Sequence, residues 1–161
     1  MTAGRRPRRD TGATGRPLIE CPAMKPESIF VPLGTLAIWT GLVLFLTGFR
    51  RVVAVTAGRV SRGAFKVGEA ADLPAELKLP NRNLMNLLEM PQLFYVVGLS
   101  FFVTHQVTPA VVGLAWLFVA LRLAHSAIHL TYNHVVHRLA VFALSNFVLL
   151  TLWIWLITRV V

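Results

Sequence analysis

The sequence contains a single cysteine, Cys21, so the chain can form no internal disulfide and no cysteine cluster for a metal ion. Charged residues are scarce: they make up 14% of the chain, against about 25% in a typical soluble domain. Only seven residues are acidic, against 16 Lys and Arg, which gives a formal net charge of +9. The basic residues lie in the N-terminal tail and at the ends of apolar runs, as in membrane proteins. No basic stripe alternates with exposed aromatic residues, so we expect no nucleic-acid partner.

Apolar residues are abundant instead: they make up 55% of the 161 residues, and the mean hydropathy is +0.63. They gather in four runs, at about residues 29–49, 84–103, 110–130 and 136–157. A helix rises about 1.5 Å per residue, so each run is long enough to cross a hydrocarbon core of about 30 Å. The sequence therefore predicts an all-α, multi-pass integral membrane protein, with one domain of four transmembrane helices over residues 26–161.

Residues 1–25 form a separate segment, rich in Arg, Gly, Thr and Pro. The segment lacks the apolar core of about 7–15 residues that a secretory signal peptide needs. We predict a disordered tail. Two alternatives stay open: the tail binds anionic lipid through its arginines, or the natural start is Met24, where the composition changes.

Polar residues interrupt the second apolar run in a regular pattern. Arg82, Asn86 and Glu89 are spaced i, i+4 and i+7, so they lie on one stripe of a helix. An Arg or Glu in the middle of a span costs about 2.5–3.5 kcal/mol. We therefore expect the stripe to face a protein interior or a polar cavity. The structural alternative is polar contact between helices, including a pair between Glu89 and Arg122.

The third run carries a second polar face. Arg122, His125, His129 and Tyr132 follow one another at helical spacing. The connections between runs place this face, the Arg82 stripe and Arg138, which opens the fourth run, near one side of the membrane. These groups suit a small anionic ligand, because arginines bind carboxylates in a bidentate manner and favour the thiolate form of a thiol.

The pattern Arg82-x-x-x-Asn86-x-x-Glu89 resembles the signature of the membrane-associated proteins in eicosanoid and glutathione metabolism. Two further features strengthen the resemblance: Arg122-Leu-Ala-His125 late in the third run, and Arg138 at the start of the fourth. The resemblance covers residues 24–161. It implies a homotrimer of four-helix protomers that binds glutathione between neighbouring subunits.

The resemblance also implies roles for single residues. Arg138 would be catalytic, by stabilising the glutathione thiolate. The residues expected to bind glutathione are Arg82, Asn86, Glu89, His125, His129, Arg122, Tyr132 and Arg51. The chain departs from one branch of the family at His129, where that branch has tyrosine, and at Leu139 and Phe142, where it has serine and tyrosine. The implied function is a glutathione-dependent membrane transferase or peroxidase, with glutathione as co-substrate and lipophilic electrophiles from the lipid as second substrate.

Two other functions compete with this one. His125, His129, His134 and His137 are superficially similar to the histidine boxes of membrane di-iron oxygenases. Such sites need more histidines than the five present, and His105 lies across the membrane, so we predict no metal site. The other alternative is a non-catalytic assembly or channel-like protein, in which glycines 34, 41 and 48 form a seam for helix packing.

Overall fold

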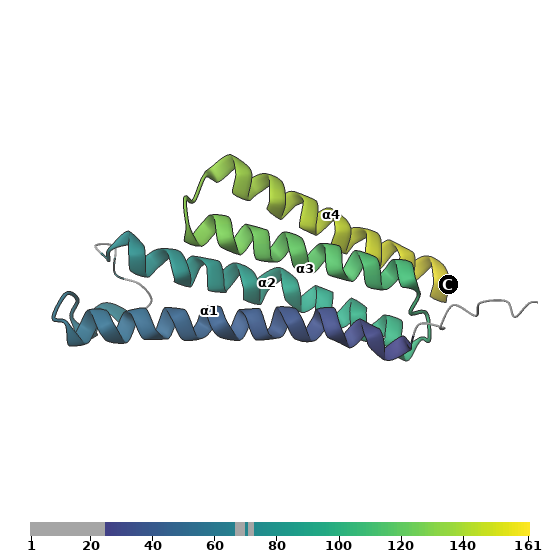
Figure 1. Cartoon of the computed structure of the whole chain (residues 1–161), viewed down its shortest axis with the longest axis horizontal. Helices are drawn as coiled ribbons and strands as arrows, with labels where there is room; N and C mark the ends of the chain where they lie inside the picture. Colours follow the sequence, from purple (N-terminus) through teal and green to yellow (C-terminus); the bar gives the residue numbers. More distant parts are fainter. Residues whose placement is uncertain (1–24, 67–69, 71–72) are drawn as a thin grey trace, which may run out of the picture.

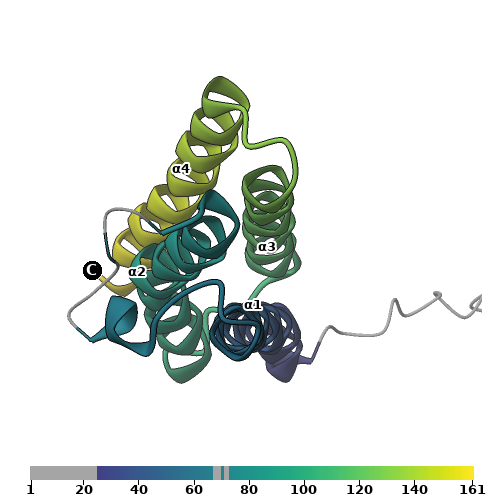
Figure 2. The same cartoon turned by 90° about the vertical axis from the view of Figure 1, so that its left-hand side faces the viewer.

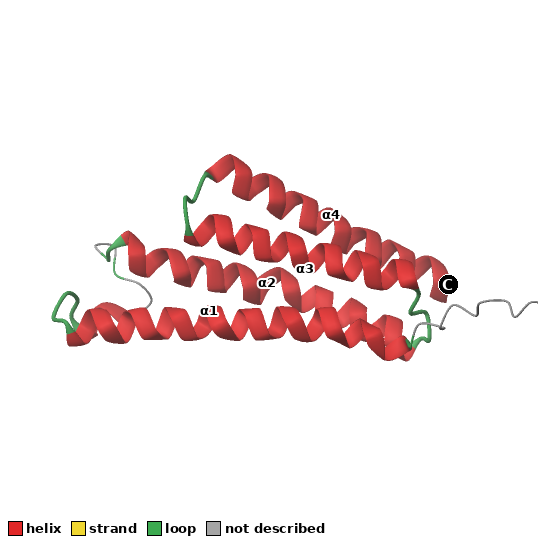
Figure 3. Ribbon diagram, viewed as in Figure 1, coloured by secondary structure: helices red, strands yellow, loops and turns green. Residues whose placement is uncertain are grey.

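The computed structural model describes residues 25–66, 70 and 73–161, and over these residues all regular secondary structure is helical (Figure 3). Residues 1–24 lie outside this range. The predictions for the tail, for Cys21 and for a natural start at Met24 therefore concern residues that the structure does not describe. Four long helices, α1 to α4, follow one another, with short 3-10 helices before α1 (η1) and after it (η2). Their bounds are η1 Pro26–Ile29, α1 Phe30–Thr56, η2 Arg62–Phe65, α2 Ala75–Val103, α3 Pro109–Leu130 and α4 Val135–Val160. All four long helices are long and apolar enough to cross a membrane, which confirms the predicted fold class.

The helices run alternately up and down. The α1–α2 and α3–α4 connections lie at one end, which we call the connector end, as the sequence predicted; the chain's C-terminus lies at the other (Figure 1). α1 packs mainly on α2, and α3 mainly on α4. α1 and α2 also project beyond the α3–α4 turn (Figure 1). Figure 2, viewed from the connector end, shows α2 lying among the other three helices, where it contacts each of them.

Two helices extend further than the apolar runs predicted. α1 continues to Thr56 rather than ending near Phe49, and α2 begins at Ala75 rather than Leu84. Hydropathy marks only the part of a helix that suits hydrocarbon, whereas good helix formers such as Glu, Leu and Lys continue the helix into the polar zone. Pro80 and Pro91 are buried within α2, and the helix runs through both.

The core is built around the apolar face of α2. Leu84, Leu87, Phe94 and Phe101 are all buried on it. Phe94 stacks on Phe118 of α3, with ring centroids 4.4 Å apart. These contacts fix the rotation of α2 about its axis, and that rotation decides which of its polar residues reach a cavity.

Candidate functional site

A cavity of about 220 Å³ lies between α2, α3 and α4 near the connector end. Asn86 of α2, His125 of α3 and Arg138 of α4 contribute its polar groups. Its apolar wall comes from Val135, Leu139 and Phe142, all of α4. The predicted convergence of polar residues from three helices is therefore confirmed for Asn86, His125 and Arg138.

Arg138 is held at this cavity by Asn133 and His129. Its Nη1 donates a hydrogen bond to Asn133 Oδ1 at 2.7 Å and lies 3.4 Å from His129 Nε2. Among the described residues the single ion pair joins Arg59 to Glu76, so no described carboxylate neutralises Arg138. Within the described part of the chain, the positive charge of this guanidinium therefore stays unpaired beside the cavity.

The polar face of α3 is almost completely buried. Arg122, His125 and His129 are 1%, 4% and 2% exposed. The Arg122 guanidinium lies 5.2 Å from the ring centroids of both Phe118 and Phe142, and its Nη2 donates to Asn146 Oδ1 at 3.2 Å.

Several polar nitrogen atoms on this face have no hydrogen-bond partner within the described part of the chain. They are Nε and Nη1 of Arg122, both ring nitrogens of His125, and Nδ1 of His129. A buried polar group without a hydrogen bond costs about 1–3 kcal/mol. Of the residues that carry these atoms, His125 lines the cavity.

The Arg82 stripe is only partly directed inward. Asn86 is half-buried and donates to the Arg82 carbonyl oxygen at 3.0 Å, whereas Arg82 and Glu89 are exposed on the protomer surface. The prediction that the stripe faces the interior is therefore wrong for these two residues within one chain. The suggested pair between Glu89 and Arg122 is wrong too, because Arg122 is buried and bonds Asn146.

Tyr132 and Arg51 also lie away from this cavity. α3 ends at Leu130, so Tyr132 does not continue its polar face, and that part of the prediction is wrong. Tyr132 is 61% exposed, and its hydroxyl lies 3.3 Å from His137 Nδ1. Arg51 sits near the end of α1, where its guanidinium lies 5.1 Å from the centroid of the Phe65 ring.

Comparison with known proteins assigns the chain to a family. The family model described as MAPEG family matches residues 29–158. The chain belongs to the MAPEG family. The resemblance found in the sequence is thereby confirmed, and family members are membrane proteins that generally use glutathione. Searches among curated proteins and among solved structures found no match to the chain.

The sequence did not single out two asparagines that bond polar side chains of this MAPEG chain. Asn83, fully buried, donates from Nδ2 to Ser126 Oγ and so ties α2 to α3. Asn133 accepts the hydrogen bond from Arg138. Asn83 could have been found, because it falls on the same helical face as Leu87. Asn133 lies in a turn, where spacing carries no such signal.

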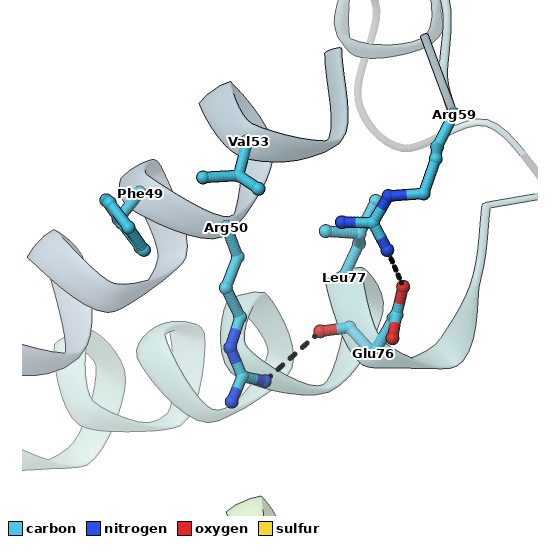
Figure 4. A pocket seen from close by; sticks show the side chains of 6 residues that line it. All are labelled: Phe49, Arg50, Val53, Arg59, Glu76 and Leu77. Atoms are coloured by element: carbon cyan, nitrogen blue, oxygen red, sulfur yellow. Dashed lines mark hydrogen bonds and ion pairs between the residues drawn. The ribbon is translucent and has the colours of Figure 1, made fainter. Parts of the chain in front are cut away.

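A second cavity, of about 320 Å³, opens between α1 and α2 at the connector end of this MAPEG chain. In Figure 4, Arg50 from α1 and Arg59 from the segment after it both reach Glu76 at the start of α2. Arg59 Nη1 pairs with Glu76 Oε1 at 2.9 Å, and Arg50 Nη1 donates to the Glu76 carbonyl oxygen at 3.3 Å. The ion pair is exposed and is worth at most about 1 kcal/mol. These contacts join the projecting ends of α1 and α2.

Among the described residues, no group of three or more His, Cys, Asp or Glu side chains is placed to hold a metal ion. The rings of His134 and His137 lie 4.4 Å apart, but both side chains are exposed. The rings of His125 and His129 lie 6.0 Å apart on the buried face of α3. The four histidines thus form two separate pairs rather than one ligand set.

Proposed function

We propose that this protein binds glutathione and uses its thiolate in transferase or peroxidase chemistry on lipophilic electrophiles. Membership of the MAPEG family supports a membrane function of the glutathione transferase, peroxidase or eicosanoid synthase kind. The observation that carries the proposal is the Arg138 guanidinium, which pairs with no described carboxylate, at a cavity that Asn86 and His125 also line.

In this proposal Arg138 is the catalytic residue. A guanidinium beside the sulfur favours the thiolate, which is the nucleophilic form of the thiol. The thiolate attacks an electrophilic carbon of the second substrate, and a carbon–sulfur bond forms as the leaving group departs. Val135, Leu139 and Phe142 present apolar groups where the lipophilic substrate would lie. With Leu139 and Phe142 in place of hydroxyl residues, the α4 wall supplies no hydroxyl to the thiolate, so its stabilisation depends on Arg138.

The site of one protomer is too small for the whole tripeptide. Small-molecule sites usually have volumes of about 300–1,000 Å³, whereas this cavity has about 220 Å³. Arg82 and Glu89 are exposed on the same helix as Asn86. We therefore propose that a second copy of the chain covers them and completes the site, in a homotrimer. The remaining proposed contacts to glutathione are Arg82, Glu89, Arg122, His129, Tyr132 and Arg51.

The test is stabilisation of the full-length chain in detergent by glutathione. At a concentration of 100 times the Kd, a ligand stabilises the folded state by about 2.7 kcal/mol. We expect a clear rise in melting temperature for the wild type and for Arg159→Ala. Arg138→Ala should lose the thiolate absorbance that appears on mixing with glutathione. Arg159 is a matched control because it lies at the opposite end of α4.

Two results would count against the proposal. Thiolate absorbance that is equal in Arg138→Ala and the wild type removes the role given to Arg138. If glutathione does not raise the melting temperature of the wild type, the protein does not bind glutathione, whatever Arg138→Ala does. The second result would favour the non-catalytic assembly function, in which the polar faces serve only contacts between helices.

A further inference from the structure

One hydrogen bond connects the α3–α4 turn to the guanidinium of Arg138. Asn133 Oδ1 accepts it from Arg138 Nη1 at 2.7 Å, and the same nitrogen lies 3.4 Å from His129 Nε2. The Arg138 side chain is thereby held between the end of α3 and the first turn of α4. At that point it also lines the cavity between α2, α3 and α4.

The backbone of Asn133 restricts which residues can stand there. Its φ is +47°, in the left-handed region, and its N–H donates to the Ile128 carbonyl oxygen at 2.8 Å. This bond closes the end of α3. Glycine adopts a left-handed φ freely, and Asn and Asp tolerate it better than other residues. The backbone therefore favours Gly, Asn or Asp at this position.

The chemistry of the side chain distinguishes these three residues. Arginine loses much rotamer freedom when its guanidinium is fixed, so an acceptor that holds it must form a good hydrogen bond. A carboxamide oxygen provides one and leaves the positive charge intact. A carboxylate would hold the guanidinium equally well but would pair with its charge. Glycine has no side chain to hold it.

We propose that Asn133 is a positioning residue for Arg138. It orients the guanidinium at the cavity and leaves its positive charge available to the sulfur of glutathione. The inference rests on the proposed function in one respect, because the role of Arg138 toward the thiolate is itself proposed there. The hydrogen bond and its effect on Arg138 do not depend on glutathione.

The first measurement addresses Arg138 alone. The full-length chain in detergent is treated with phenylglyoxal, which modifies arginines, and the modification rate of Arg138 is followed by peptide mass spectrometry. We expect Asn133→Gly to raise this rate by roughly tenfold or more, as the loss of one hydrogen bond to a charged group implies. Arg159 serves as the reference in each sample. Thr131→Ala is the matched control, because Thr131 lies in the same turn and its hydroxyl bonds Ala127 rather than Arg138. An unchanged rate in Asn133→Gly overturns the proposal.

The second measurement follows the thiolate of bound glutathione by ultraviolet absorbance against pH. We expect a lower thiolate fraction at neutral pH in Asn133→Gly, where Arg138 is released, and in Asn133→Asp, where its charge is paired. Thr131→Ala should titrate like the wild type. Asn133→Gly should still fold, because glycine adopts φ +47° without strain. If it does not fold, Asn133→Asp carries the test, and a wild-type titration in that variant overturns the proposal.

The two measurements separate this inference from the proposed function. If the wild type forms no thiolate with glutathione, the proposed function fails, and the rate at Arg138 still decides whether Asn133 positions it. If the wild type forms thiolate and Asn133→Gly behaves like it in both measurements, the proposed function stands and the inference about Asn133 is wrong.

Discussion

Gly98 of α2 lies where a side chain would collide with α1. A Cβ atom at this position would lie 2.8 Å from Leu33 Cδ1 and 3.0 Å from Leu33 Cδ2. Non-bonded carbons normally lie about 3.5–4.0 Å apart. Leu33 is only 7% exposed, so it has little room to move. The substitution Gly98→Ala must therefore displace the Leu33 side chain or separate the two helices.

The expected magnitude follows from two opposing effects. Forcing an extra methyl group into a packed core costs about 1–3 kcal/mol. Replacing glycine by alanine inside a helix gains about 0.8–1.0 kcal/mol. We therefore expect Gly98→Ala to lower the free energy of unfolding by about 0–2 kcal/mol. Gly113→Ala in α3 is the matched control: no atom lies within 4 Å of its added Cβ, so only the gain should be seen.

The difference in unfolding free energy between the two variants isolates the cost of the collision, about 1–3 kcal/mol. It can be measured by unfolding the protein in mixed micelles with an increasing fraction of denaturing detergent. A double variant with Leu33→Ala removes the three atoms nearest the new methyl group. The cost of Gly98→Ala should then shrink by about 0.5 kcal/mol or more. Equal effects at Gly98 and Gly113, or strict additivity with Leu33→Ala, would refute the close approach of α1 and α2.

Further substitutions test other parts of the structure. The free energy of unfolding of Arg122→Met should lie within about 1–2 kcal/mol of the wild-type value, because methionine fills similar space without a buried charge. Arg122→Ala should lower that free energy by about 2–5 kcal/mol. Equal losses in the two variants in denaturation experiments would contradict this reasoning. Asn83→Ala should cost about 1–3 kcal/mol, and a double-mutant cycle with Ser126→Ala should show coupling of about 0.5 kcal/mol or more. Additive effects would argue against that hydrogen bond. A Cβ atom added at Gly41 meets no described atom within 4 Å. Gly41→Leu should therefore leave the protomer folded but break up the proposed trimer, as light scattering in detergent can show. A trimer that persists would place the glycine seam away from the subunit contact.

The sequence predicted which polar residues meet at the cavity better than it predicted which way the Arg82 stripe faces. Asn86, His125 and Arg138 converge as expected, because helices of known length with short connections can bring them only to one end of the bundle. Arg82 and Glu89 were expected inside with Asn86 and are exposed. A helix turns about 100° per residue, so these three residues lie within about 60° of one another. The buried face, centred near Leu87, lies roughly 100–160° from them. Asn86 is the nearest of the three to that face, and it alone reaches the cavity.

The number of helices, their membrane-spanning character and the family were determined by the sequence itself, because hydropathy and motif spacing are properties of single segments. The exposure of Arg82 and Glu89, the hydrogen bond from Asn83 to Ser126 and the hydrogen bond from Arg138 to Asn133 were decided by the tertiary structure. Each depends on how one helix is rotated against another or on the path of a turn. Those are set by side-chain contacts between segments far apart in the chain, which no pattern within one segment contains.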